Sequence, residues 1–337
     1  MRQPATAPVL ALCRSAIPRP AWYPSQVRRW IWPAIAIVIG VAAYAMIGDV
    51  QQAGDRLGGF AWSALPLAIC LALVNYAIRF VRWELYLRRQ GVRVPLPASA
   101  LVFGAGLSLA ITPGKIGELV KSFLLRELYG TPATRTAPIV VAERISDLIA
   151  LLVLAVIGVA AYGLDVTLVA IAGALVALGL VLIAWPRAMH AVLDLVTRPA
   201  RLRRFRTPLY ELYAGLAGLC RPRLLAAATA LAIPAWGAEC VGFAAIVNAF
   251  PDAHVELGLA VVIYASTTIA GALSFLPGGL GVTEGAMILL LVQSVPGLAR
   301  ATALDATLLT RLATLWFAVL VGLVCLAAAR RRIARRA

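Results

Sequence analysis

The stretch Ile111-Thr112-Pro113-Gly114-Lys115-Ile116-Gly117-Glu118 places a charged turn inside an otherwise hydrophobic region. Proline removes a backbone donor and glycine removes side-chain restraint, so the two together predict a break in a helix. Directly after the break, Leu119, Val120, Phe123 and Leu124 are apolar at helical spacing. The stretch therefore predicts two short helical arms joined by a turn.

A second break has the same design. It is the stretch Leu276-Pro277-Gly278-Gly279-Leu280-Gly281-Val282-Thr283-Glu284-Gly285, and an apolar arm follows it. Each break precedes a membrane-length segment that carries an arginine, Arg144 in one case and Arg311 in the other. Broken helices at corresponding places in two halves of a chain point to the binding site of a transporter.

The composition indicates an integral membrane protein. Of the 337 residues, 62% are hydrophobic, and the mean hydropathy is +0.88, whereas soluble domains are about 45–50% apolar. The net charge of +16 therefore does not indicate a nucleic-acid partner. It comes from arginines in four loops and tails, at residues 14–29, 88–93, 187–223 and 330–336. The positive-inside rule assigns these segments to the cytoplasm, so both termini of this cell-membrane protein are expected there.

The hydrophobic segments predict six full spans, since a span needs about 20 apolar residues. They are expected at 30–47, 62–87, 138–162, 167–185, 224–250 and 304–329. The arms of the two broken stretches are too short to cross, which favours re-entrant hairpins at 98–126 and 257–297. Because each full span carries the chain to the other side of the membrane, the first hairpin is expected to enter from the cytoplasm and the second from the outer face. The predicted fold is an all-α polytopic bundle with two broken-helix hairpins arranged as an inverted repeat.

The domain organisation follows from these spans. A basic cytoplasmic tail covers 1–29, the first membrane repeat 30–162, the second 163–329, and a basic tail 330–337. The second repeat contains the segment 186–223, where arginines alternate with apolar residues. This segment is expected to form an interfacial helix pair on anionic headgroups.

Charged residues inside the membrane are costly and mark candidate sites. Asn75, Arg79 and Arg82 form one polar stripe on the second span, and Glu143 and Asp147 share a face close to Arg144. Two plainer interpretations stay open. Arg79 and Arg82 lie near the cytoplasmic end and could snorkel to the interface. The acidic residues could pair structurally with Arg79 or with the lysines, Lys115 and Lys121.

The second half offers Glu239, which has no local partner in the sequence, and Arg311, for which Glu284 is the nearest candidate partner. The turns themselves also suggest a site, because a helix N-terminus attracts anions. Gly114, Lys115, Gly117 and, in the second turn, Gly281 are candidates to hold a phosphate. In the alternative, the turns only build the hairpin tips, and Glu118 and Glu284 complement the helix dipoles.

Catalytic and cofactor motifs of soluble enzymes are absent from the sequence. His190 and His254 fall in or beside loops on opposite predicted sides and are not expected to share a metal. We expect no enzyme activity and no cofactor.

Three motifs carry a family resemblance: Pro113-Gly114-Lys115-Ile116-Gly117-Glu118, Ala142-Glu143-Arg144-Ile145-Ser146-Asp147 and Leu276-Pro277-Gly278-Gly279-Leu280-Gly281. With them, the chain resembles the lysylphosphatidylglycerol synthase transmembrane-region family, which includes UPF0104-type membrane proteins. The resemblance implies a polytopic bundle that moves a lipid between leaflets. It also implies a polar site at Lys115, Glu118, Glu143, Arg144, Asp147 and Glu284. The full synthase has a soluble aminoacyl-transfer domain after its membrane region, whereas this sequence ends at Ala337, so we do not expect that enzyme activity from this chain by itself.

The expected function is translocation of an anionic or phosphate-bearing membrane lipid. One alternative is an intramembrane lipid- or glycosyl-transfer enzyme with Glu143 or Asp147 as base. Another is a non-transporting scaffold for a lipid-modifying enzyme, docked through 186–223. The candidate substrate-binding residues are Asn75, Arg79, Gly114, Lys115, Gly117, Glu118, Glu143, Arg144, Asp147, Glu239, Gly281, Glu284 and Arg311.

Overall fold

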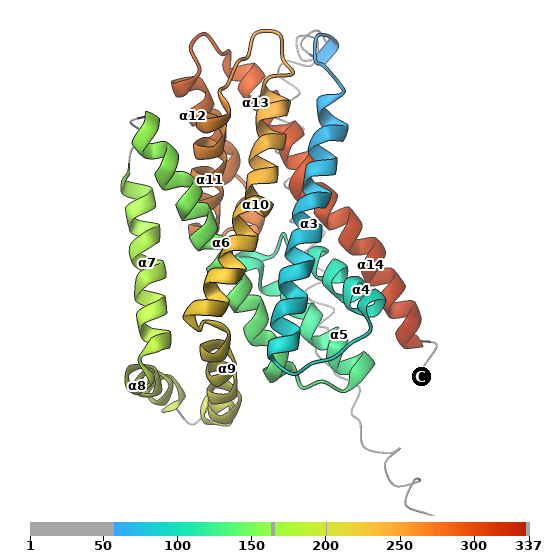
Figure 1. Ribbon diagram of the computed structural model, residues 1–337, viewed down its shortest axis with the longest axis vertical. Coiled ribbons are helices and arrows are strands. Elements are labelled where there is room, and N and C mark those ends of the chain that lie inside the picture. The colour runs from blue at the N-terminus through green and yellow to red at the C-terminus, as the bar shows by residue number, and fades with distance from the viewer. Residues whose placement is uncertain (1–56, 163–165, 200, 335–337) are drawn as a thin grey trace, which may run out of the picture. The chain divides into compact units, whose positions relative to one another are not determined.

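The computed structural model describes residues 57–162, 166–199 and 201–334, which belong to one compact unit (Figure 1). The predicted tail 1–29 and the predicted first span 30–47 lie outside the described residues. The surroundings of Gly114 and the side chain of Lys115 also lie outside the described part.

Every regular element in the described part of the chain is a helix. The α-helices are α3 (Ala64–Arg89), α4 (Leu96–Leu107), α5 (Val120–Tyr129), α6 (Ala133–Tyr162), α7 (Thr167–Ala184), α8 (Pro186–Thr197), α9 (Arg206–Leu219), α10 (Pro222–Val247), α11 (Leu257–Leu273), α12 (Val282–Ser294), α13 (Arg300–Arg311) and α14 (Phe317–Ala334). Shorter pieces are the 3₁₀ turns η1 (Pro113–Leu119), η2 (Arg203–Phe205) and η3 (Pro277–Gly279), and the π-helical segment η4 (Leu312–Trp316).

Four helical stretches are long and apolar enough to cross a membrane: α3, α7, α10 and the continuous run Arg300–Ala334. They overlap four of the predicted spans, and the all-helical, multi-pass character is confirmed. Helix α6 has 30 residues and is about 45 Å long at about 1.5 Å per residue. Which end of each helix faces the cytoplasm stays a prediction.

Local sequence explains where several helices start and stop. Pro186 and Pro222 occupy the first turns of α8 and α10, where a missing N–H costs nothing. Gly130 ends α5 in the left-handed conformation, with φ of 67°, as glycine allows at a helix C-terminus. Arg88 and Arg89 lie in the last turn of α3 and complement its dipole.

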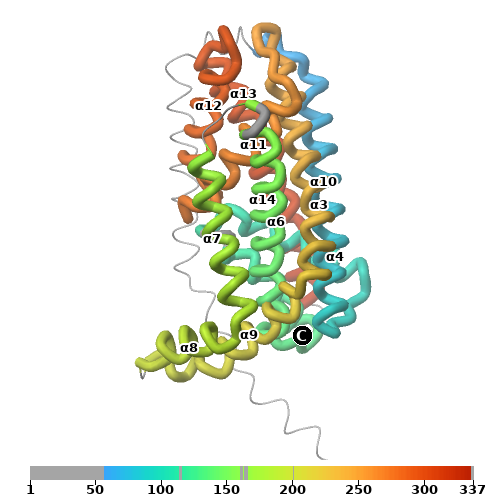
Figure 2. Tube along the Cα trace, turned by 60° about the vertical axis from the view of Figure 1, so that its left-hand side comes forward, coloured from blue at the N-terminus to red at the C-terminus, as the bar shows by residue number. Residues whose placement is uncertain are grey.

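Both predicted breaks interrupt helices at the expected prolines, Pro113 and Pro277. Figures 1 and 2 show α4 and α5 at the same end of the bundle as α8 and α9, whereas α11 and α12 extend from the opposite end. The two tips contact each other, with residues of η1 next to residues of η3. The approach is close, since a methyl group added at Gly278 would lie 3.2 Å from Cγ1 of Ile111. Re-entry into a membrane and descent from an inverted repeat stay predictions.

Apolar packing divides into two clusters, one around each broken element. One includes Ile263 of α11 and Met287 of α12, and the other includes Phe103 of α4 and Leu125 of α5. Each hairpin is thus held by its own apolar packing, while the tips approach each other.

The last predicted span, 304–329, is built differently from the expectation. It begins earlier, at Arg300, and changes to π-helical geometry directly after Arg311. A π-helical turn leaves a carbonyl without its usual helical partner, and here the Tyr76 hydroxyl donates to the Thr314 carbonyl at 3.0 Å. Asp305, at the start of this predicted span, is buried in α13.

Candidate functional site

A cavity of about 300 Å³ lies where the two hairpin tips meet. Ala110 and Thr112 line it from the first break, and Gly278 and Gly279 from the second. Its charged lining consists of Arg79, Arg144, Arg311, Asp147 and Glu239. The volume is at the small end for ligand sites, which suits a headgroup better than an entire lipid.

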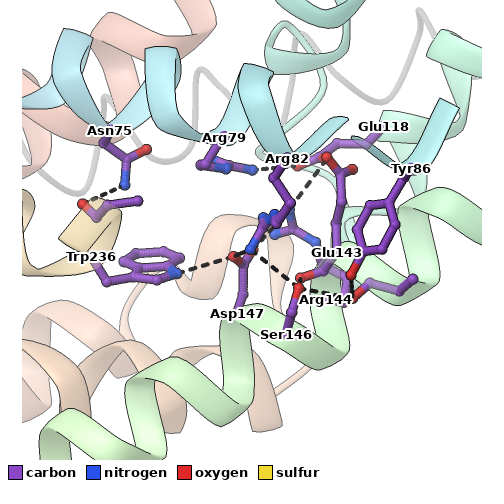
Figure 3. A network of polar contacts seen from close by, with 12 residues as sticks. Asn75, Arg79, Arg82, Tyr86, Glu118, Glu143, Arg144, Ser146, Asp147 and Trp236 are labelled. Carbon is purple, nitrogen blue, oxygen red and sulfur yellow. Dashed lines mark hydrogen bonds and ion pairs between the residues drawn. The ribbon is translucent and has the colours of Figure 1, made fainter. Parts of the chain in front are cut away.

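A buried charge cluster adjoins the cavity on the side of the first hairpin (Figure 3). Its centre is Glu118, at the end of η1, whose carboxylate lies 3.3 Å from Lys121 Nζ, 3.4 Å from Arg144 Nη2 and 3.8 Å from Arg79 Nη2. The side chain of Glu118 is 2% exposed. A buried carboxylate of this kind requires such partners, because an isolated buried charge is very unfavourable.

Asp147 is the second acidic centre of the cluster. Its Oδ1 lies 2.7 Å from Arg82 Nη1 and accepts a hydrogen bond from Trp236 Nε1 at 3.1 Å. Its Oδ2 lies 3.1 Å from Arg144 Nη2. The carboxylate therefore joins α3, α6 and α10, and Figure 3 shows these side chains converging on it.

The snorkelling interpretation of Arg79 and Arg82 is wrong. The Arg82 side chain is 0% exposed and that of Arg79 is 7% exposed, and both guanidinium groups face acidic residues within the protein. The three polar residues of the α3 stripe contact other parts of the protein: Asn75 contacts α10, Arg79 contacts η1 and Arg82 contacts α6.

Glu143 is fully buried and accepts a hydrogen bond from Lys121 Nζ at 2.6 Å. The same Nζ lies 4.7 Å from the centroid of the Trp83 ring, close enough for a cation–π contact. Glu143 does not line the cavity. The pairing of Glu143 with Lys121, one of the alternatives that the sequence left open, is present in the structure.

The formal charges of this cluster do not cancel. Four cationic side chains, Arg79, Arg82, Lys121 and Arg144, face three carboxylates, those of Glu118, Glu143 and Asp147. When Arg311, Glu284 and Glu239 are included, this set of residues holds five charges of each sign. Any preference for anions therefore comes from where the cations lie, not from the total charge.

Two arginines of the cavity wall retain hydrogen-bonding capacity. Neither Arg79 Nε nor Arg144 Nε has a hydrogen-bond partner among the described residues, although both atoms are buried. The ion pair of Arg79 is also long, at 3.8 Å. Buried donors are normally satisfied, so such exceptions indicate strain, water or a ligand.

At the second hairpin, Arg311 Nε lies 2.6 Å from Glu284 Oε1, and Arg311 Nη2 donates to the Gly278 carbonyl at 2.6 Å. The pairing of Arg311 with Glu284 is as the sequence suggested. Arg311 therefore ties η3 to α12 and to the start of the π-helical segment.

Two of the turn N–H groups that we expected to hold an anion have partners within the protein, and anion binding at the turns stays a prediction. The Gly117 N–H donates to Thr112 Oγ1 at 2.7 Å, and the Gly281 N–H donates to Glu284 Oε2 at 2.7 Å. The second contact is one side of a capping box in which Glu284 caps its own helix. Gly114 and Lys115 belong to η1, and the side chain of Lys115 lies outside the described part.

Glu239 lines the opposite wall of the cavity from α10 and accepts a hydrogen bond from Tyr264 Oη at 2.6 Å. Asn75 is completely buried and donates to the Ala235 carbonyl at 2.8 Å, which ties α3 to α10. It does not line the cavity, so its observed role is structural.

Four aromatic residues of the cavity wall were not predicted, and three of them carry a hydrogen-bonding atom: Tyr76, Trp236 and Tyr264. In a membrane span an aromatic residue resembles any other apolar residue, and only its polar atom distinguishes it. The spacing of Tyr76 one position after Asn75 and three before Arg79 is the only available signal, and it is weak.

Comparison with known proteins gives a consistent result. The sequence profile of the lysylphosphatidylglycerol synthase TM region matches residues 31–322. A UPF0104 membrane protein from Methanothermobacter thermautotrophicus is 23% identical over 325 residues, which cover 87% of this chain and 94% of that protein. The profile covers most of the chain, including both breaks and the charge cluster, and this chain therefore belongs to the lysylphosphatidylglycerol synthase TM region family.

Proposed function

We propose that this membrane protein is a translocase that moves an anionic or phosphate-bearing lipid between leaflets, with the headgroup bound in the cavity between the two hairpin tips. The observation that carries the proposal is the incomplete pairing of Arg79. This arginine is buried, lines the cavity, has only a 3.8 Å ion pair and keeps Nε without a hydrogen-bond partner among the described residues.

The chemistry of the cavity fits a phosphate. Guanidinium groups bind phosphate oxygens through charge-assisted hydrogen bonds, and Arg79, Arg144 and Arg311 reach the cavity from three different helices. The two hairpin tips also end at the cavity, so a headgroup there would contact elements that extend from both ends of the bundle. Broken helices beside a central site are a recurring arrangement in transporters.

The transfer-enzyme alternative receives less support from the same geometry. Asp147 has both carboxylate oxygens engaged by Arg82, Trp236 and Arg144. Glu143 is buried against Lys121 and does not line the cavity. Asp147 already has internal partners and Glu143 does not reach the cavity, so neither side chain is placed to accept a proton from a bound substrate.

Reconstitution into liposomes tests the proposal. A labelled phosphatidylglycerol and a labelled neutral glycolipid with the same chains are placed in the outer leaflet, and their arrival in the inner leaflet is followed. We expect faster movement of the phosphate-bearing lipid than in protein-free liposomes, no acceleration for the neutral glycolipid, and recovery of both lipids chemically unchanged. Chemical modification of the lipid would favour the enzyme alternative. Movement only after addition of a second protein would favour the scaffold.

A further inference from the structure

Helices α8 and α9 form a pair at one end of the bundle, and their polar contacts face each other. Asp194 of α8 lies 2.8 Å from Arg206 Nη2 and accepts a hydrogen bond from Tyr210 Oη at 2.8 Å, both from α9. The ring centroids of His190 and Tyr210 are 5.0 Å apart. The polar side of α8 is therefore directed at its neighbour.

The opposite side of α8 is apolar and exposed in the part of the chain that the structure describes. Val192, Leu195 and Val196, at positions i, i+3 and i+4, lie on one face of the helix, and Leu195 is 67% exposed. In a helix at a water-exposed protein surface the arrangement is the reverse, with the apolar stripe against the protein. An outward apolar stripe on a helix whose polar side is occupied requires an apolar surrounding.

This stripe continues the outer surface of α7. Ile171, Leu175, Leu178 and Val181 are exposed along one side of α7, which is one of the four candidate spans. The chain then bends at Trp185, which is 58% exposed, and Figure 2 shows α8 lying across the end of α7. From this we infer that lipid chains contact the exposed side of α7 and that the headgroup region begins where α7 ends.

The charge of the segment fits an anionic surface. Residues 186–223 contain eight arginines, all exposed, against the two acidic residues Asp194 and Glu211. Near an anionic leaflet, such arginines interact with headgroup phosphates while neighbouring apolar side chains insert among the acyl chains.

We propose that α8 and α9 form an in-plane platform that inserts the stripe Val192–Leu195–Val196 into the bilayer and binds anionic lipid headgroups through the surrounding arginines. This platform is a lipid-binding surface separate from the central cavity. It does not depend on whether the cavity transports lipid.

Spin labelling in nanodiscs tests the platform. Leu195→Cys and, as a control, Glu211→Cys on the exposed side of α9 are labelled in a chain whose native cysteines are replaced. The nanodiscs contain phosphatidylcholine alone or with added phosphatidylglycerol. At Leu195 we expect collisions with oxygen to exceed collisions with a water-soluble nickel chelate several-fold, and the opposite order at Glu211. Phosphatidylglycerol should increase the contrast at Leu195, and replacement of Arg203, Arg204 and Arg206 by glutamine should remove that increase.

Two results would overturn the proposal. Nickel-chelate access at Leu195 equal to that at Glu211 would place α8 in water. Strong dipolar coupling between labels on two copies would make the stripe a protein interface. If the cysteine-free chain does not fold, amide hydrogen exchange of α8 in the native chain replaces the labels. The platform then predicts slower exchange with phosphatidylglycerol present, and equal exchange in both nanodiscs would contradict it.

Discussion

The two broken helices share one device and use it in different surroundings. In each, a glutamate after the break contacts an arginine of a following helix, Glu118 with Arg144 at 3.4 Å and Glu284 with Arg311 at 2.6 Å. Glu118 is buried and shared among three cations. Glu284 is partly exposed, pairs with a single arginine and caps its own helix.

The difference teaches which charges stabilise the fold and which remain available to a ligand. Beside the first hairpin, removing Asp147 leaves the fully buried Arg82 without compensation, and such losses are large. In the second hairpin both partners are partly exposed, Arg311 to 13% and Glu284 to 16%, so the loss should be smaller. The same substitution chemistry should therefore give different results at the two tips.

The largest effect is expected for Asp147→Ala. It would leave Arg82, which is 0% exposed, without its carboxylate, and breaking a buried pair from one side costs about 3–5 kcal/mol. Thermal unfolding of the purified protein in detergent measures the loss. Asp252→Ala, at an exposed aspartate after α10, is the control and should change the melting temperature little. Equal melting temperatures for the two variants would contradict the buried-cluster interpretation.

An intermediate effect is expected at the second tip. Arg311→Gln removes the contacts to Glu284 and to the Gly278 carbonyl, and charge-assisted hydrogen bonds of this kind contribute about 1.5–3 kcal/mol. Glu284→Gln should cost less, because glutamine can still accept from the Gly281 N–H. Thermal unfolding of both single variants and the double variant gives the interaction free energy between the two side chains. Strictly additive losses would mean that the two residues do not act as a pair.

Much of the architecture could be predicted from the sequence, because it depends on local chemistry. Pro113 and Pro277 determined the breaks, and the arginine of the last span was correctly matched with Glu284. The contacts within the first cluster could not be predicted, because they depend on how α3, α5 and α6 are rotated against one another. Sequence spacing places Arg79 and Arg82 on one face of α3 but does not say that this face meets Glu118 and Asp147.

A small, pH-dependent effect is expected outside both hairpins, between α8 and α9. The hydrogen bond from Tyr210 and, secondarily, the charge of Arg206 lower the pKa of Asp194 below its ordinary value. A lowered pKa in the folded state means that the contact stabilises the pair above the ordinary carboxyl pKa and is lost as the pH falls through the lowered one. The protection of the α8 amides, corrected for the intrinsic pH dependence of exchange, should therefore fall in acid. The variant Asp194→Asn should show lower protection already at neutral pH and a smaller further fall in acid, and a variant with the native profile would exclude this contact as the cause.

Within the first cluster, Arg79 and Arg82 offer the sharpest contrast, since they come from one helix and differ in what they face. Arg82 has a 2.7 Å pair with Asp147 and does not line the cavity. Arg79 has a 3.8 Å pair and does line it. If Arg79 is removed, Glu118 keeps Lys121 and Arg144 as partners, so the fold should tolerate the loss.

The most direct measurement is lipid transport and thermal stability determined on the same purified samples of Arg79→Gln, Arg82→Gln and the native chain. We predict that Arg79→Gln melts close to the native protein and transports phosphatidylglycerol no faster than protein-free liposomes, whereas Arg82→Gln melts at a clearly lower temperature. Arg79→Gln that is both stable and fully active would contradict the proposal that the headgroup binds in the cavity between the hairpin tips.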